Sequence, residues 1–285
     1  MKPLGLFVKK DITLNEELYN LVEGKRIAIV GPAPYLQGLG RGEHFDAYDI
    51  VVRPNEIIPL RDIRHDYGSR TDIMFNNFGT PWMPGIKRKL DIDDHMEHFK
   101  SLKLVVSSGI KAKHSDTDYL SWPDDHVSDI IENFNDINKY DLPFYWIGVK
   151  DYKTLHSKVG VEFNTGLGAI LILLQYPIKE LHLAGFSFFK GGASYEDIYC
   201  KGHMDELDTN GKPMGFNAGH GARANQVQLD YFKNLLRHST DVRLSIDSYL
   251  KNLLGIEYEN VVNLHPSHTG ETRFTGQISC LEQSD

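Results

Sequence analysis

The sequence predicts an α/β fold built on a mainly parallel β-sheet that is flanked by helices. Short runs of β-branched and other apolar residues alternate with longer helical stretches along most of the 285-residue chain. This alternation is typical of parallel sheets, because each parallel strand needs a crossover, usually a helix, to reach the next strand. The first apolar run also leads into a glycine-rich turn, as strands do where open α/β sheets bind nucleotides. We therefore expect a Rossmann-like arrangement.

The expected strands are short apolar segments, most of them followed by glycine, proline, asparagine, serine or aspartate, which end strands. They are residues 26–30, 50–53, 72–75, 102–106, 144–149, 180–184 and 242–246. The expected helices have amphipathic or continuous apolar patterns with helical spacing. They are residues 11–22, 126–134, 151–157, 166–175, 224–238 and 247–253.

The composition favours a single domain over residues 1–285, because 41% of the residues are hydrophobic, enough for one large core. Within it, residues 26 to about 246 carry the motifs described below. Residues 76–101 are expected to form a long surface excursion. The glycine-rich segment 186–220 is expected to be a mobile lid over a site.

Charge and hydropathy exclude several classes of protein. The formal net charge is −8, and no run of lysine and arginine suggests a basic face for nucleic acid. The apolar run 167–174 is far shorter than the roughly 20 residues that span a bilayer, so we expect a buried helix and no membrane span. Two cysteines, Cys200 and Cys280, do not make a disulfide framework, and the first residues lack a signal peptide's apolar stretch. We therefore expect a cytoplasmic protein.

The turn at residues 31–42, with Gly31 as its first residue, is a candidate nucleotide site. Glycine at a strand end lets the backbone approach a phosphate or a ribose. The dinucleotide fingerprint needs a glycine where Ala33 stands, and the chain has no G-x-x-x-x-G-K-[ST] phosphate loop. By itself, this turn fits an ordinary loop as well as a nucleotide site.

Residues 45–55 and 67–72 carry a more specific pattern. They read F-D-A-Y-D-I-V-V-R-P-N and Y-G-S-R-T-D. The order of strand, glycine-rich turn, D-x-x-D-x-V-x-R-x-N and G-S-[KR]-T resembles the large sialylmotif of glycosyltransferase family 29, the sialyltransferases. The resemblance implies that Asn55 contacts a CMP donor. Taken alone, Arg53 and Asn55 also fit a strand end that is closed by a turn-forming asparagine.

Residues 163–186 carry a second pattern. Asn164, Thr165 and Gly166 precede an apolar helix, and the strand that follows ends in Gly185 and Phe186. A capped helix start gathers N–H groups at its positive end, where anions bind, although most caps hold no ligand. The arrangement resembles the small sialylmotif. That likeness implies that the first three residues face the CMP phosphate or ribose, and that the last two line the cytidine pocket.

Two histidines correspond to the remaining signatures of this family. His220 precedes the expected helix 224–238 at the family's distance, and the resemblance makes it the general base. An imidazole with a pKa near ~6.5 can accept a hydroxyl proton at neutral pH. His203 corresponds to an upstream histidine that helps to hold the leaving phosphate. Other polar residues of the same loop are alternatives for that role: Lys190, Tyr195, Tyr199 and Lys201.

Three features depart from the family pattern. Pro32 stands where the family has an asparagine, so one donor contact is missing. Asn225 stands where a glutamate would orient the catalytic histidine, and Gln226, Gln228 or an acidic residue elsewhere could substitute. The half-cystines that join the two motifs in Golgi members are also missing, which agrees with a reducing cytoplasm.

No metal site or other cofactor is expected. No D-x-D sequence follows a candidate strand, and the spacing of His265, His268 and Glu271 is not that of a helical zinc motif. CMP leaves as a single phosphate, so helix N–H groups, histidine and hydroxyls could hold it without a divalent ion.

The motifs together predict an inverting glycosyltransferase on a fold similar to the GT-A-variant fold of sialyltransferases. It would move sialic acid or a related acidic sugar from a CMP-sugar donor to a glycan acceptor. Two alternatives stay open: a CMP-Kdo-type transferase, and a catalytically inert protein that binds sugar nucleotides or glycans. Ala33 and the absence of an acidic residue at the end of the second strand disfavour a nicotinamide-dependent oxidoreductase.

Overall fold

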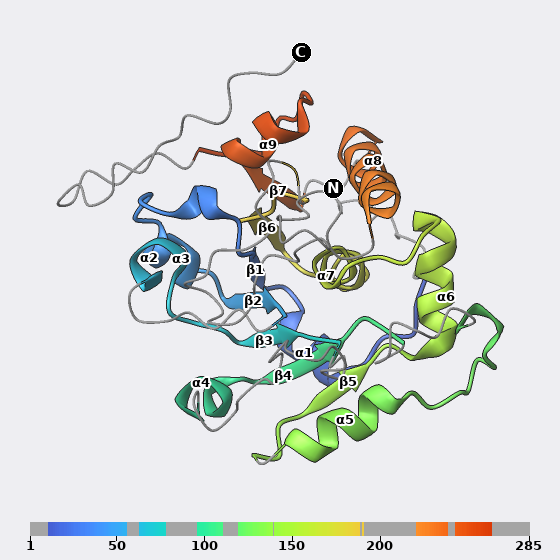
Figure 1. The fold of residues 1–285 in the computed structure, drawn as a ribbon. Coiled ribbons are helices and arrows are strands. Elements are labelled where there is room, and N and C mark those ends of the chain that lie inside the picture. The colour runs from blue at the N-terminus through green and yellow to red at the C-terminus, as the bar shows by residue number, and fades with distance from the viewer. Residues whose placement is uncertain are drawn as a thin grey trace, which may run out of the picture.

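The computed structural model describes residues 11–55, 63–77, 96–110, 119–138, 140–188, 190, 221–238 and 243–263. Its centre is an eight-stranded sheet with the strand order β5-β4-β3-β2-β1-β6-β7-β8 (Figure 1). Every neighbouring pair in this sheet is parallel. The arrangement confirms the α/β class with a parallel sheet.

The strands agree closely with the sequence prediction at the centre of the sheet and less well at its edges. The strands are β1 Arg26–Val30, β2 Ile50–Pro54, β3 Ile73–Phe75, β4 Leu104–Ser107, β5 Phe144–Trp146, β6 Glu180–Ala184, β7 Leu244–Asp247 and β8 Val261–Val262. The strand expected at 144–149 was predicted too long, because Gly148 has a positive φ of 78° and begins a helix. The two-residue edge strand β8 was not predicted.

The helices likewise agree with the prediction better in their position along the sequence than in their first and last residues. They are α1 Glu16–Val22, α2 Gly42–Asp46, α3 Arg64–Tyr67, α4 Met96–Ser101, α5 Asp129–Ile137, α6 Gly148–Val159, α7 Thr165–Leu173, α8 Ala222–His238 and α9 Ser248–Leu254, with 3₁₀ turns η1 Pro34–Leu36 and η3 Tyr119–Ser121. Helix α1 starts later than expected because Asn15 caps it, accepting a hydrogen bond from Leu18 N at 2.9 Å. Of the expected excursion 76–101, residues 96–101 form α4 instead, and residues 78–95 lie outside the described residues.

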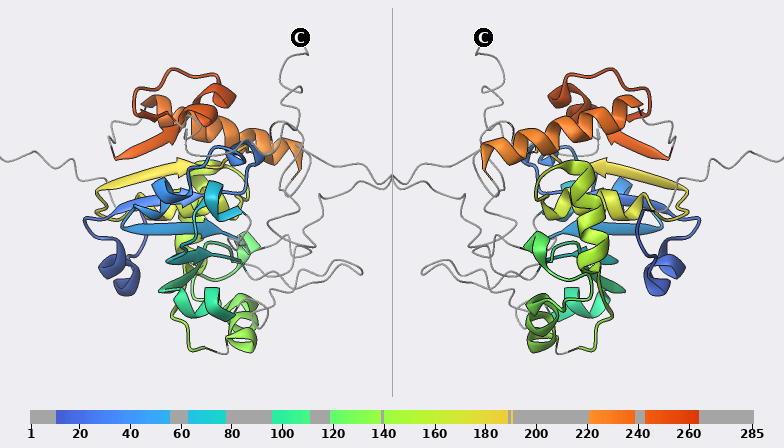
Figure 2. Two further views of the ribbon diagram at one scale, coloured as in Figure 1. Left: turned by 90° about the vertical axis from the view of Figure 1, so that its left-hand side faces the viewer. Right: turned by 90° about the vertical axis from the view of Figure 1, so that its right-hand side faces the viewer.

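Helices cover both faces of the sheet (Figure 1, Figure 2). Successive side chains of a strand point to opposite faces, so Ile27 and Ile29 pack on one side of β1 while Ala28 and Val30 pack on the other. The first face is covered by α1, α6, α7, α8 and α9, and the second by α2, α3, α4 and α5. Burial on both faces explains why the central strands are almost continuously apolar. None of the helices among the described residues is long and apolar enough to cross a membrane.

The second face buries a histidine. His182 of β6 stacks on Tyr48 with ring centroids 5.6 Å apart, and its Nδ1 lies 3.0 Å from Ser245 Oγ. Its Nε2 has no hydrogen-bond partner among the described residues. Burial, followed by the charge of His44, lowers the pKa of His182 to about 3.

This lowered pKa predicts a loss of stability in acid. A histidine whose pKa is lower in the folded than in the unfolded chain stabilises the fold above the unfolded value, about 6.5, and that stability is lost as the pH falls towards 3. Between pH 7.5 and 5.5 the free energy of unfolding should therefore drop by ~1.4 kcal/mol on account of His182. Urea unfolding of the wild type and of His182→Phe at both pH values measures this difference. The exposed-site variant His65→Asn is the control, and an equal drop in His182→Phe and the wild type would contradict the assignment.

Candidate functional site

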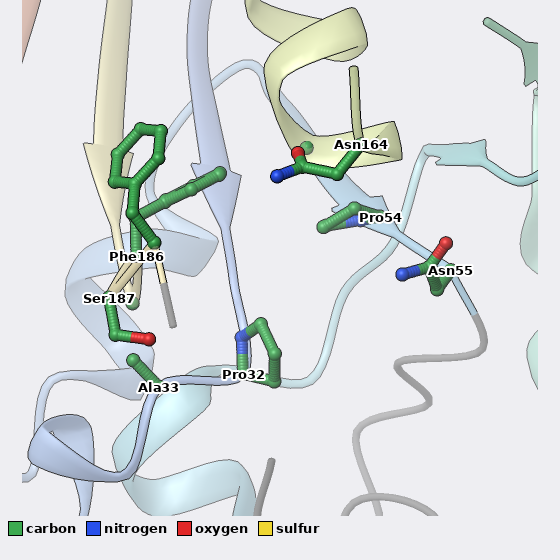
Figure 3. Close-up of a pocket in the computed structure, with 10 residues that line it drawn as sticks. Pro32, Ala33, Pro54, Asn55, Asn164, Phe186 and Ser187 are labelled. Carbon is green, nitrogen blue, oxygen red and sulfur yellow. The ribbon is translucent and has the colours of Figure 1, made fainter. Parts of the chain in front are cut away.

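A pocket opens at the carboxyl edge of the sheet, between the ends of β1, β2 and β6 and the start of α7 (Figure 3). It contains about 510 Å³ of atom-free space, counted together with its open mouth. Its lining is Pro32, Ala33, Pro54, Asn55, Asn164, Gly166, Gly185, Phe186, Ser187 and Phe188.

The topology of the sheet explains why a pocket forms there. From β1 the chain builds outward through β2, β3, β4 and β5, and then returns to place β6 on the other side of β1. The turns that leave β1 and β6 therefore diverge to opposite faces, which opens a crevice at the carboxyl ends of these strands. In open α/β sheets this switch point is where ligands bind.

Gly31 and Gly185 allow the ends of β1 and β6 to approach closely. A Cβ atom at either position would lie 2.3 Å from the carbonyl oxygen of the other glycine. Gly31 N donates to Ala184 O at 2.8 Å, and Ala33 N donates to Gly185 O at 2.9 Å, so the pairing of the strands continues into the turns. Gly31 thus packs behind the pocket and is not part of its lining, whereas Gly185 is.

Asn55 lies at the end of β2 and lines the pocket. Its φ of 56° is a left-handed conformation, which asparagine adopts more readily than other residues with a side chain. Its backbone N donates to Phe75 O at 2.6 Å and fixes the residue at the sheet edge. The side chain is left to project at the rim, opposite Phe186 (Figure 3).

Arg53, two residues earlier, holds the fold together. Its side chain is fully buried, and its guanidinium donates to Tyr67 O at 2.7 Å, to Arg70 O at 3.0 Å and to Thr71 Oγ1 at 3.1 Å. These acceptors belong to the Y-G-S-R-T-D segment, residues 67–72, of the same sequence pattern. Arg53 therefore fastens that segment to the end of β2.

The G-S-R-T segment is also held by Asp46. The Asp46 carboxylate accepts hydrogen bonds from Ser69 N and Oγ at 2.8 Å and from Arg70 N at 3.0 Å. Arg70 in turn donates to Asp46 O at 2.7 Å and pairs with Asp72 at 2.8 Å. Pro54 and Asn55, at the end of the first sequence pattern, reach the pocket. Asp46, Arg53 and Arg70 brace the loops around it.

The start of α7 forms another side of the pocket. Asn164 caps the helix, because its Oδ1 accepts a hydrogen bond from Leu167 N at 2.8 Å, and its amide nitrogen turns toward the hollow (Figure 3). Gly166 lies under the ring of Phe186, and a Cβ atom there would come within 2.9 Å of that ring. Thr165 is buried beside them and is not part of the lining.

Helix α8 is tied to this helix start through Gln228. Asn164 N donates to Gln228 Oε1 at 2.8 Å, and the Gln228 side chain is fully buried. Its Nε2 has no partner among the described residues. Asn225, which stands at the position of the family's glutamate, is also buried in α8. Gln228 therefore holds Asn164. From the sequence, Gln228 was instead a possible substitute for the glutamate that would orient His220.

The expected catalytic histidines, His203 and His220, lie outside the described residues, as does most of the expected lid, together with Tyr195, Tyr199 and Lys201. Helix α8 begins at Ala222. Lys190 is described, and its Nζ donates to Leu253 O at 3.3 Å.

Sequence reasoning missed a hydrogen-bonded pair, the half-buried Tyr35 and the fully buried Asp247. The Tyr35 hydroxyl accepts from Gly185 N at 2.8 Å and from Phe186 N at 3.0 Å, and it donates to Asp247 Oδ2 at 2.7 Å. Burial raises the pKa of the Asp247 carboxyl to about 6, against the lowering effect of its hydrogen bonds to Leu250 N and Tyr35. No motif marks these residues, because they lie 212 positions apart in the sequence.

Comparison with known proteins gives structural likeness alone. No protein-family model matches the sequence, and a search of curated proteins finds no match. An apo α-2,3-sialyltransferase from Campylobacter jejuni is 14% identical with a TM-score of 0.47, covering 94% of this chain and 93% of that one. A mammalian sialyltransferase in complex with Gal-beta-1-3GalNAc-ortho-nitrophenol is 17% identical with a TM-score of 0.44, covering 82% and 73%.

The hydrogen bonds of the buried Arg53 predict that replacing this residue strongly destabilises the protein. Arg53→Met should lower the free energy of unfolding by about 2–4 kcal/mol, because buried carbonyl groups lose a charged donor. Denaturant unfolding measures the change. The matched control is Arg26→Met, since the Arg26 side chain is 39% exposed and pairs with Glu180, and such a pair contributes about 0–1 kcal/mol. If Arg53→Met lowers the free energy of unfolding by less than about 1 kcal/mol, the stabilising role of Arg53 would be contradicted.

Proposed function

We propose that this protein is an inverting glycosyltransferase that transfers sialic acid or a related acidic sugar from a CMP donor to a glycan hydroxyl. One observation carries the proposal. Two sequence segments that resemble the large and small sialylmotifs contribute Asn55, Asn164, Gly166, Gly185 and Phe186 to the lining of a single pocket. That pocket lies at the switch point of a parallel sheet, where nucleotide ligands bind.

The chemistry of the lining suits a nucleoside monophosphate. Phe186 and Pro54 offer apolar surface to a base and a ribose, and the amides of Asn55 and Asn164 offer hydrogen bonds to hydroxyl groups. Helix α7 is nine residues long, and its positive N-terminus faces the same hollow. A phosphate at that end would be stabilised by the helix dipole and by free N–H groups.

The proposed reaction is a direct displacement. The acceptor hydroxyl attacks the anomeric carbon of the sugar, and its proton passes to His220 as the general base. The bond to the phosphate oxygen breaks, and CMP leaves with the electron pair, so the anomeric configuration inverts. The start of α7, assisted by His203, would stabilise the leaving phosphate. The hydrogen bond between Gln228 and Asn164 supports this scheme, because it joins the donor pocket to the helix that follows His220 in the chain.

One feature of the pocket favours a second donor, CMP-Kdo. Pro32 lines the hollow at the position where the sialyltransferase pattern has an asparagine. Proline supplies neither an amide side chain nor a backbone N–H, so a donor sugar would lose a contact there. Assaying the purified protein with both CMP-sugars decides between the donors, and binding without transfer would favour the inert sugar-nucleotide-binding alternative.

The pocket predicts selective stabilisation by CMP. CMP at 100 times its dissociation constant should add about 2.7 kcal/mol to the free energy of unfolding, whereas UDP and NAD should not. In Asn55→Gly, CMP affinity should fall about tenfold or more through loss of the amide, without backbone strain because glycine also accepts a positive φ. Thermal shift and titration calorimetry measure both effects.

Asp141→Gly is the matched control for this variant, since Asp141 has a φ of 50° and lies outside the pocket. It should bind CMP like the wild type. Stabilisation by UDP or NAD with none by CMP would contradict the donor assignment.

His220→Ala should abolish transfer while leaving CMP affinity nearly unchanged. A general base contacts the acceptor hydroxyl and contributes about 10²–10⁴-fold to the rate, so its loss appears in turnover and not in nucleotide binding. Initial-rate assays and CMP titration on the same preparation measure both quantities, with His65→Ala as the control. Wild-type turnover in His220→Ala would show that another residue is the base, and His203 would be tested next.

A further inference from the structure

The wall of the pocket at Gly185 and Phe186 is held from behind by one tyrosine hydroxyl. Tyr35 Oη accepts two backbone hydrogen bonds, from Gly185 N at 2.8 Å and from Phe186 N at 3.0 Å. A hydroxyl oxygen has two lone pairs and one proton, so both acceptor sites are filled. Its proton goes to Asp247 Oδ2 at 2.7 Å. Every hydrogen-bonding position of this hydroxyl is therefore used.

The Asp247 carboxylate, at the end of this chain of hydrogen bonds, is itself held in place. Asp247 is the last residue of β7 and is fully buried. Its Oδ1 accepts a hydrogen bond from Leu250 N at 2.7 Å and caps α9, which leaves Oδ2 for Tyr35. The Tyr35 ring stacks on Tyr249 of α9 with centroids 5.4 Å apart. Strand β7 and helix α9 thus supply the rigid support for the hydroxyl.

We propose that Tyr35 and Asp247 are positioning residues for ligand binding, which fix the pocket wall at Gly185 and Phe186 by a directed chain of hydrogen bonds. The chain runs from the two peptide N–H groups through the phenol to the carboxylate. A hydrogen bond to a charged acceptor is about twice as strong as one between neutral groups. The proposal deepens the function proposed above, and it rests on that function where CMP is the ligand.

The same chain of hydrogen bonds orients the ligand. Because Tyr35 occupies both N–H groups, the corner at Gly185 and Phe186 has no free backbone donor for an anion. It presents the Phe186 ring to the hollow instead, as Figure 3 shows. The start of α7 is the side that attracts negative charge. A nucleotide therefore places its base and ribose against Phe186 and its phosphate toward Asn164.

Two substitutions test the chain with little change in shape. Tyr35→Phe removes the shared acceptor and keeps the stack on Tyr249. Asp247→Asn keeps an oxygen to cap α9, a role in which asparagine is as good as aspartate, but it turns an amide donor toward the Tyr35 hydroxyl. The matched control is Tyr176→Phe, because the Tyr176 hydroxyl also accepts a backbone hydrogen bond, from Asn15 N at 3.0 Å, in another part of the protein.

The measurements are amide hydrogen exchange of the free protein and titration with CMP. In Tyr35→Phe and Asp247→Asn, exchange of the segment containing Gly185 and Phe186 should speed up about fivefold or more, the effect of one net hydrogen bond. Exchange in α5, which packs near the opposite edge of the sheet, should stay unchanged, and CMP affinity should fall about fivefold or more. Tyr176→Phe should leave both the segment and the affinity as in the wild type.

Unchanged exchange at Gly185 and Phe186 in Tyr35→Phe would overturn the proposal. Faster exchange with wild-type CMP affinity would overturn it as well, since the chain would then support the fold without positioning the ligand. If the wild type binds no CMP, the donor assignment falls, and the exchange comparison still decides whether Tyr35 and Asp247 hold this wall.

Discussion

The contact between the backbones of Gly31 and Gly185 determines the shape of the site. Neither residue could carry a side chain, because a Cβ atom would lie 2.3 Å from the opposite carbonyl oxygen. The contact keeps β1 and β6 paired up to the point where their turns separate to opposite faces of the sheet. Close packing at the strand ends thus sets the back of the pocket, and the residues after each glycine form its walls. A phosphate-binding role is not needed to explain Gly31.

Polar side chains then hold each loop at the edge of the sheet. Arg53 fastens the G-S-R-T segment, Gln228 fastens the start of α7, and Tyr35 fastens the turn after β6. In each case a side chain bonds to backbone groups that the sheet and helices leave without a partner, and a buried backbone group without a partner is costly. The parallel sheet provides the edge, and these three links determine where the lining residues stand along it.

The sequence was sufficient for the fold class and for the central strands, because continuous apolar runs that end in glycine or proline leave few other readings. It was insufficient where a single residue determines the boundary of an element. Gly148 is an example, because it starts α6 and so ends β5 earlier than expected. The two motif segments predicted residues that the fold does bring to one pocket, among them Asn55 and Phe186. The pattern could not separate Asn55, which lines that pocket, from Arg53, which braces it, since burial depends on the tertiary fold. Pairs such as Tyr35 and Asp247 are invisible to local patterns, and the roles of the histidines stay predictions.

The central claim is that residues from both motif segments bind one nucleotide in one pocket. A crystal structure of the wild-type protein with CMP tests it most directly. The account predicts that the base and ribose lie against Phe186 within reach of the Asn55 amide, with the phosphate at the start of α7 beside Asn164. CMP bound elsewhere on the molecule, or in this pocket with its phosphate turned toward Gly185 and away from α7, would contradict the account.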